Sequence, residues 1–222
     1  MMKEAKIYLF RHGETFYNEK GIFTGWKDSK LSPKGKKSAK ILAQKLKNKR
    51  FEIAFQTRLS RSKDTLKEVL KFHSECKKTI TDDRMIERNY GVLNGTSHEV
   101  FIKKMGEKLY NLEVYGDLIY DMNEKAKNKF KHFLGEQEYE AIHRGFNVKP
   151  PKGESFAMVE KRVESFIKDL KKIMKKEKTN VAISAHGNSI RLFRKIMEKS
   201  KKEETVKWKI PYDKYYEYSI KI

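Results

Sequence analysis

Short apolar runs bounded by polar residues recur along the chain, at residues 5–10, 51–56 and 180–185. Each run has the length of a strand and is too short to complete an amphipathic helix, so the pattern predicts three buried strands. A brief run at residues 79–81 and a longer one at residues 216–222 predict a short further strand and an edge strand.

Helical periodicity fills the intervals between these strands. Ser32 followed by Pro33 is typical of a helix start, with a serine N-cap and a proline at the first helical position. Further helices are predicted over residues 59–73, 155–176 and 190–197. The inward-facing side chains recur at helical spacing: Ala39, Leu42, Ala43, Leu46, Leu66, Val69, Leu70, Phe156, Val159, Val163, Phe166, Ile167, Leu170 and Ile173. Alternating strands and helices predict an α/β fold, a three-layer α/β/α sandwich around a mostly parallel sheet.

Residues 99–143 break this alternation, because they combine dense charge with scattered aromatic side chains and show no strand pattern. The aromatic residues are Phe101, Tyr110, Tyr115, Tyr120, Phe130, Phe133 and Tyr139. We expect a helical insertion that caps the site, within one domain spanning residues 1–222. A solvated helical pair without a function is an equally good interpretation of the same pattern.

Composition narrows the class of protein. The 222 residues are 38% hydrophobic and 36% charged, which supports one substantial core beneath a highly charged surface. The formal net charge is +21, but the lysines are spread along the whole chain instead of forming one basic arm. Nucleic-acid binding is therefore the remote alternative, since a basic surface also attracts small phosphorylated metabolites.

Other classes are excluded by what the sequence lacks. Cys76 is the single cysteine, so the chain forms neither an intramolecular disulfide nor a cysteine-based metal site. No stretch approaches the ~20 apolar residues of a membrane span, and the first residues lack a signal-peptide pattern. We expect a soluble cytoplasmic protein, and the sequence leaves a homo-oligomer open.

The candidate chemistry lies at two predicted strand ends that share a His-Gly pair. One strand runs into His12-Gly13 and another into His186-Gly187. In a parallel sheet, ligands bind beyond the carboxyl ends of the strands, so we expect His12 and His186 to meet at one site. A lone histidine is more often a core or surface residue, and zinc would need a third ligand that neither motif supplies.

A neutral imidazole is a good nucleophile toward phosphorus when cations hold the phosphoryl oxygens. Arginine binds two phosphate oxygens at once, and only 10 of the 51 basic residues are arginines. An arginine next to a predicted strand end or candidate motif therefore indicates a phosphate contact. The arginines in such positions are Arg11, Arg61, Arg88 and Arg144. The pattern favours phosphoryl transfer through a phosphohistidine at His12.

Further motifs extend the two His-Gly pairs in order along the chain. They are residues 11–15 (RHGET), 23–26 (FTGW), 30–35 (KLSPKG), 59–62 (LSRS), 87–95 (ERNYGVLNG), 153–155 (GES) and 185–191 (AHGNSIR). Together they resemble the histidine phosphatase superfamily and, within it, the bisphosphoglycerate-dependent phosphoglycerate mutases. The resemblance covers nearly the whole chain except residues 99–143.

The resemblance implies a role for each matching residue. His12 would be the phosphorylated nucleophile, and Glu87 would donate and accept the proton of the substrate hydroxyl. The residues implied to bind the transferring phosphoryl group are Arg11, Arg61 and His186. Positions that match substrate contacts are Asn18, Thr24, Gly25, Arg88, Tyr90, Gly187 and Asn188. The implied substrate is a small phosphorylated metabolite, the implied phosphoryl primer is 2,3-bisphosphoglycerate, and no metal is implied.

Two places depart from the mutase pattern. His98 stands where the family has a lysine that contacts the substrate, and His143-Arg144 stands where it has adjacent arginines. His98 and Arg144 are therefore the candidate contacts to the distal part of the substrate. Motif density favours interconversion of 3-phosphoglycerate and 2-phosphoglycerate. The two histidines favour the alternative, hydrolysis of small phosphomonoesters through the same intermediate.

Overall fold

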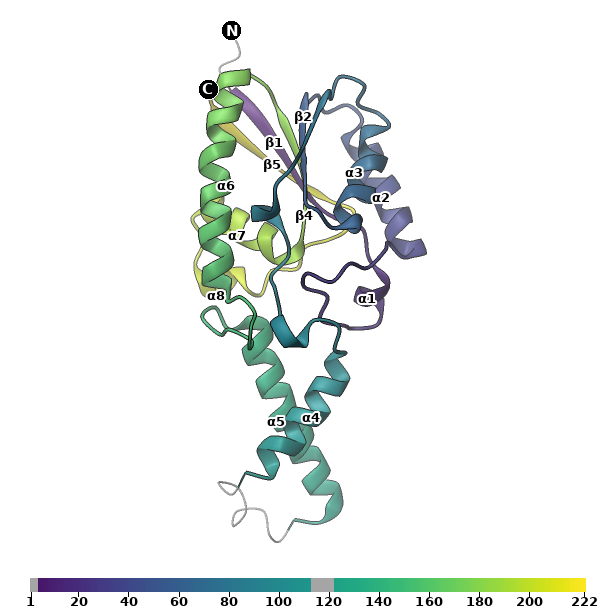
Figure 1. Ribbon diagram of the computed structural model, residues 1–222, viewed down its shortest axis with the longest axis vertical. Coiled ribbons are helices and arrows are strands. Elements are labelled where there is room, and N and C mark those ends of the chain that lie inside the picture. The colour runs from purple at the N-terminus through teal and green to yellow at the C-terminus, as the bar shows by residue number, and fades with distance from the viewer. Residues whose placement is uncertain (1–3, 113–121) are drawn as a thin grey trace.

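The computed structural model describes residues 4–112 and 122–222 and is built around one five-stranded sheet (Figure 1). The strands are β1 (Glu4–Arg11), β2 (Ile53–Gln56), β3 (Lys78–Thr81), β4 (Val181–Ala185) and β5 (Tyr215–Lys221). They lie in the order β3-β2-β4-β1-β5, and only β5 runs antiparallel to its neighbour. The predicted, mostly parallel sheet is confirmed.

Helices cover both faces of this sheet, as the sandwich prediction requires (Figure 1). The longer helices of the sandwich are α2 (Pro33–Leu46), α3 (Ser60–Leu70), α6 (Phe156–Glu177) and α7 (Gly187–Glu198). The short ones are α1 (Phe16–Glu19) and α8 (Lys202–Thr205), with single 3₁₀ turns at Asp83–Met85 and Gly91–Leu93. Helices α2 and α3 lie on one face, and α6 and α7 on the other.

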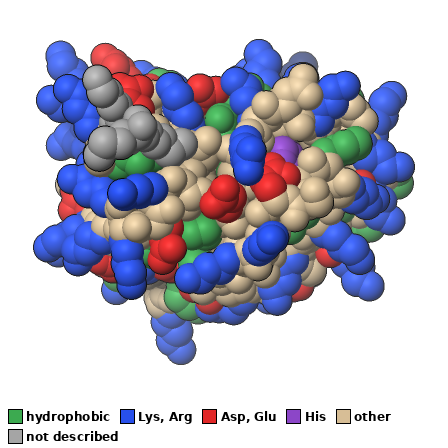
Figure 2. Space-filling model, turned by 90° about the horizontal axis from the view of Figure 1, so that it is seen from above, with side chains coloured by type: hydrophobic (Ala, Val, Ile, Leu, Met, Phe, Trp, Pro, Cys, Tyr) green, Lys and Arg blue, Asp and Glu red, His purple; other side chains and the backbone are tan. Residues whose placement is uncertain are grey.

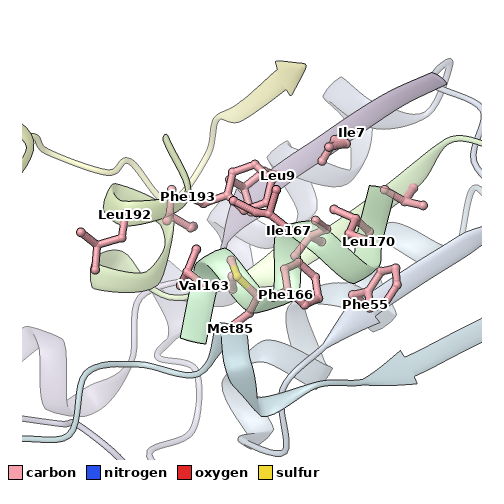
Figure 3. Close-up of a cluster of buried hydrophobic side chains, with 14 of the residues drawn as sticks. Ile7, Leu9, Phe55, Met85, Val163, Phe166, Ile167, Leu170, Leu192 and Phe193 are labelled. Carbon is pink, nitrogen blue, oxygen red and sulfur yellow. The ribbon is translucent and has the colours of Figure 1, made fainter. Parts of the chain in front are cut away.

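The alternation of side chains along β1 explains why its sequence is apolar at every position from Ile7 to Phe10. Tyr8 and Phe10 pack toward α2 and α3, whereas Ile7 and Leu9 pack into the larger cluster under α6 and α7. Figure 3 shows this larger cluster, in which Phe166 of α6 lies among side chains of the sheet. A strand covered on both faces has no solvent side, so its sequence reads as a continuous apolar run.

Local capping fixes where the helices around the sheet begin and end. The Ser32 hydroxyl accepts a 3.1 Å hydrogen bond from the Gly35 amide, which confirms the predicted start of α2. Helix α3 ends at Leu70, before the predicted residue 73, because the chain turns there with the His73 amide bonded to the Leu70 carbonyl. Helix α7 begins at Gly187, three residues before the predicted start, because its first turn is polar and carries no apolar periodicity.

The insertion consists of α4 (His98–Tyr110) and α5 (Glu124–Arg144), which project from the sandwich as a helical pair (Figure 1). A Cβ atom on Gly106 would lie 2.0 Å from the Lys131 carbonyl oxygen, and one on Gly135 would lie 2.0 Å from that of Ile102. The two backbones therefore touch at their crossing, which only glycine permits. Tyr115 and Tyr120 lie outside the described residues, and the role of the pair as a cap stays a prediction.

Basic side chains are scattered over the surface. Figure 2 shows Lys and Arg side chains around the whole visible face, interspersed with Asp and Glu, and no single basic patch on it. No helix in the two described ranges is both long enough and apolar enough to cross a bilayer.

Candidate active site

The site lies where β1 and β4 end side by side. Arg11 stands opposite Ala185 in the parallel register, and the His12 amide continues the ladder with a 3.0 Å hydrogen bond to the Ala185 carbonyl. This pairing brings the two His-Gly motifs together, with the ring centroids of His12 and His186 4.9 Å apart. The topology thus unites two motifs from opposite ends of the chain.

A cavity of about 250 Å³ opens at these strand ends. The predicted site residues that line it are Arg11, His12, Asn18, Thr24, Gly25, Arg61, Glu87, Tyr90, His98, Gly187 and Asn188. The predicted site residues outside its lining are His186, Arg88 and Arg144. In the described ranges, no group of three or more His, Cys, Asp or Glu side chains is placed to hold a metal ion.

The His12 ring is arranged as a neutral nucleophile. Its Nδ1 lies 2.7 Å from the Gly13 carbonyl oxygen, and a carbonyl can only accept, so Nδ1 carries the hydrogen and Nε2 keeps its lone pair. Burial, then the charges of Arg61 and Arg11, hold the pKa of His12 well below its usual range. At neutral pH the imidazole is therefore uncharged and Nε2 is free to attack.

Two guanidinium groups flank this ring. Arg11 lies over the ring of Tyr212 at 4.1 Å and donates to the Ile210 carbonyl at 2.9 Å. Arg61 is buried and donates to the carbonyls of Gly25 and Lys27 at 2.8 and 2.9 Å. The Nε atoms of both arginines are buried without a partner, so each retains a donor for an anionic group.

Burial lowers the pKa of Arg61 to about 10, which leaves it positively charged at neutral pH. The cations beside His12 therefore persist under the conditions in which the ring is neutral. This combination is what phosphoryl transfer to a histidine requires, because charge on the phosphoryl oxygens must be balanced while the nucleophile stays unprotonated.

The Glu87 carboxyl group is held by the start of α7. Its Oε1 accepts hydrogen bonds from the amides of Arg88 at 2.8 Å and Asn188 at 3.1 Å. A Cβ atom on Gly187 would lie 3.6 Å from Glu87 Oε2 and 3.6 Å from Arg11 Cζ, which places this second oxygen near the cations. Oε2 has no hydrogen-bond partner among the described residues, so it is available for proton exchange with a ligand.

Sequence comparison agrees with this geometry. The profile of the histidine phosphatase superfamily (branch 1) matches residues 7–118 and 119–221. The chain belongs to the histidine phosphatase superfamily.

Both mutases and phosphatases of this superfamily resemble the chain. A 2,3-bisphosphoglycerate-dependent phosphoglycerate mutase of Pseudoalteromonas atlantica is 32% identical over 83% of this chain and 80% of its own length. A crystal structure of phosphoglycerate mutase from Bacillus anthracis has a TM-score of 0.72 and 22% identity, covering 99% of this chain and 89% of its own. The structure of the α-ribazole phosphatase from Shigella flexneri has a TM-score of 0.63 and 20% identity, covering 90% of this chain and 83% of its own. The shared fold therefore does not separate the two activities.

In this member of the superfamily, His186 lies next to His12 and outside the cavity lining. Its Nε2 is 2.8 Å from the Thr57 hydroxyl, and its Nδ1 is buried without a partner. Burial, followed by the charge of Arg61, keeps the pKa of His186 well below its usual range. The predicted contact of His186 with the phosphoryl group would use the unpartnered Nδ1.

Two predicted substrate contacts are directed elsewhere in the structure. The buried Arg88 guanidinium donates to the carbonyls of Glu154, Ile142 and Val148 at 2.7, 2.9 and 2.9 Å. Arg144 donates to the Val206 carbonyl at 2.8 Å. Main-chain acceptors hold both side chains outside the cavity lining, and the role of Arg88 and Arg144 as substrate contacts stays a prediction.

The distal wall of the cavity is aromatic and neutral. The rings of His98 and His143 lie 4.5 and 6.4 Å from Phe23, and His143 stacks 5.1 Å from Tyr139. Burial lowers the pKa of both histidines, that of His143 to about 3 with a further contribution from Arg144. These two positions therefore add no positive charge at neutral pH.

Sequence analysis assigned no role to Arg191 and Tyr212, whose polar side chains line the cavity. Arg191 closes the 185–191 motif and stands one helical turn after Asn188, whose Oδ1 accepts its 2.7 Å hydrogen bond. That i, i+3 spacing was a usable signal for Arg191. Tyr212 carries no comparable signal, because it lies in a loop without periodicity.

We predict that Arg88 is required for stability. Arg88→Gln removes a guanidinium that satisfies three carbonyls, and should lower the free energy of unfolding by about 2–4 kcal/mol in urea denaturation. The control Arg50→Gln alters a side chain that is 78% exposed, and should change this free energy by less than about 1 kcal/mol. Normal stability with lost substrate affinity in Arg88→Gln would instead make Arg88 a substrate contact.

The buried neutral histidines predict destabilisation by acid. An unfolded histidine titrates near pH ~6.5, so below that value the unfolded chain binds a proton that folded His143, with a pKa of about 3, does not. Stability is therefore full above about pH 6.5 and falls as the pH drops toward about 3. Between about pH 7 and about pH 5, the free energy of unfolding of His143→Gln should fall by on the order of 1–2 kcal/mol less than that of the wild type. Equal losses in urea titrations of both proteins would contradict this.

Proposed function

We propose that this histidine phosphatase superfamily enzyme interconverts 3-phosphoglycerate and 2-phosphoglycerate through a phosphohistidine on His12, primed by 2,3-bisphosphoglycerate. The observation that carries the phosphoryl-transfer step is the neutral His12 ring, with its lone pair on Nε2, between two unpartnered guanidinium donors. The choice of phosphoglycerates is supported by the mutase relatives, which are 30–34% identical over most of the chain.

The priming step forms one bond and breaks another. His12 Nε2 attacks a phosphorus atom of 2,3-bisphosphoglycerate, and the bond from phosphorus to the sugar-acid oxygen breaks. Arg11 and Arg61 balance the charge on the phosphoryl oxygens, and protonated Glu87 gives its proton to the departing oxygen. The hydrogen stays on Nδ1 and is donated to the Gly13 carbonyl, and this hydrogen bond stabilises the positive charge that the ring gains.

Turnover then reverses this step on the other oxygen of the substrate. The hydroxyl of 3-phosphoglycerate loses its proton to the Glu87 carboxylate and takes the phosphoryl group from His12, giving 2,3-bisphosphoglycerate. After the bisphosphorylated species turns in the cavity, its other phosphoryl group returns to His12 and 2-phosphoglycerate leaves. Atoms and charge balance over the cycle, and Glu87 is restored.

A phosphatase is the second candidate, and the neutral distal wall is the observation that favours it. His98 and His143 do not provide the cations that would retain a half-transferred bisphosphoglycerate. If water enters while His12 is phosphorylated, Glu87 can deprotonate it, and phosphate is released instead of an isomer.

We predict that 2,3-bisphosphoglycerate stimulates formation of 2-phosphoglycerate from 3-phosphoglycerate far above phosphate release, because a bound phosphoglycerate intercepts phosphohistidine before water. The measurement follows both products, with and without primer. His12→Ala should abolish both products and the acid-labile, base-stable adduct, a loss of several orders of magnitude. Phosphate release from many monoesters without isomerisation would reject the mutase and retain the phosphatase.

We predict that Glu87→Gln slows turnover by roughly 10²–10⁴-fold, because an amide cannot exchange the proton of the substrate oxygen. The amide oxygen can still accept from the Arg88 and Asn188 amides, so the unfolding temperature should stay close to that of the wild type. A variant that keeps most of its rate would show that Glu87 serves only to anchor the start of α7.

A further inference from the structure

Among the described residues, three cationic side chains line the cavity, and only two of them flank His12. The third is Arg191, on the first turns of α7. Its Nε donates to the Trp208 carbonyl at 2.8 Å and its Nη1 to Asn188 Oδ1 at 2.7 Å, which fixes the plane of the guanidinium. Its Nη2 has no hydrogen-bond partner among the described residues.

Arg191 is close enough to Arg11, beside His12, and to His143 in the distal wall to interact electrostatically with both. A Cβ atom on Gly187 would lie 3.6 Å from Arg191 Nη1 and also 3.6 Å from Arg11 Cζ, so both guanidinium groups border Gly187. Asn188, which holds Arg191, also donates to the Tyr90 hydroxyl at 3.2 Å. The charge of Arg191 helps to lower the pKa of His143 in the distal wall.

The charges that line the cavity are unbalanced. Burial, then repulsion from Arg11, lowers the pKa of Arg191 only to about 10, so it stays charged at neutral pH. Glu87 is the only acidic side chain in the described lining, against three arginines. A phosphate group between Arg11 and Arg61 would bind two of the cations. Glu87 attracts the third, Arg191, but no hydrogen bond joins the two side chains, so Arg191 Nη2 remains a free donor among the described residues. Like charges held this close in a desolvated cavity are unfavourable until an anion joins them.

We propose that Arg191 is a specificity-determining residue that binds the carboxylate of a phosphorylated hydroxy acid, and so supplies the distal cation that His98 and His143 do not. The inference rests on the proposed phosphoryl-transfer site and deepens it by naming the substrate feature that the site selects. Binding places the planar carboxylate against a guanidinium already oriented by Asn188 and Trp208, so little conformational entropy is lost.

The test compares two ligands that differ at one group. 3-Phosphoglycerate carries the carboxylate, and glycerol 3-phosphate has a neutral hydroxymethyl group in its place. Isothermal titration calorimetry measures the Kd of each ligand for the wild type, Arg191→Gln and Arg191→Lys. Arg194→Gln is the matched control, because Arg194 lies on the same helix but pairs with Glu198 at 3.0 Å and stacks on Trp208 at 4.1 Å.

We expect Arg191→Gln to raise the Kd of 3-phosphoglycerate by about 10–100-fold and that of glycerol 3-phosphate by less than about threefold. Arg191→Lys should raise the Kd of 3-phosphoglycerate by an intermediate factor. Arg194→Gln should leave the ratio of the two Kd values unchanged. An equal loss for both ligands would reduce Arg191 to a structural residue, and no preference for the carboxylate in the wild type would also overturn the proposal.

The two proposals fail separately. Kd values do not depend on which molecule finally takes the phosphoryl group from His12. A phosphatase without isomerisation would therefore still show carboxylate selectivity lost in Arg191→Gln. Conversely, a working mutase whose selectivity survives Arg191→Gln would leave the proposed function intact and reject the role of Arg191.

Discussion

The parallel pairing of β1 with β4 is the constraint on which the site depends. It sets Arg11 opposite Ala185 and ends in the hydrogen bond from the His12 amide, so the register of two strands fixes the distance between the two histidine rings. Helix α7 starts immediately after His186, which directs the Asn188 amide at Glu87. A slip of one residue would turn every side chain of the strand to the opposite face. The sheet and the start of α7 therefore position His12 and Glu87, the proposed nucleophile and proton donor.

The same geometry places like charges close together in the cavity. Buried guanidinium groups and an uncharged imidazole share one small cavity, and each cation makes protonation of His12 harder. The repulsion is tolerated because carbonyl oxygens of Gly25, Lys27 and Ile210 accept from the arginines and orient them before any ligand arrives. An anion that binds here meets donors that are already oriented, so the protein needs little reorganisation. The bound anion also screens the repulsion between the cations, which adds to its affinity.

Much of the fold followed from local patterns, whereas part of the site did not. The central strands β1, β2 and β4 were predictable because burial on both faces makes the middle of each sequence mostly apolar. The meeting of His12 with His186 followed from parallel topology. The position of Arg88 was not predictable, since the carbonyls that hold it belong to a segment more than fifty residues further along the chain. The start of α7 at Gly187 was not predicted, because residues 187–189 are not apolar and so show no core-facing pattern. Sequence patterns record burial and local capping, but not where a long polar side chain finds its acceptors.

Lysine and arginine side chains occupy different places in the protein and interact with anions in different ways. Lysines make up most of the 51 basic residues and are spread over the surface, where strongly hydrated ammonium groups attract anions without fixing their orientation. Several arginines point inward and bind carbonyl oxygens, as Arg162 does at Glu87 and Arg88 does at Glu154. A guanidinium can satisfy main-chain acceptors on one edge and present donors on another, which an ammonium group cannot do with the same directional control. The net charge of +21 therefore attracts anions to the surface in general, whereas the few arginines that line the cavity are oriented and can bind an anion in one geometry.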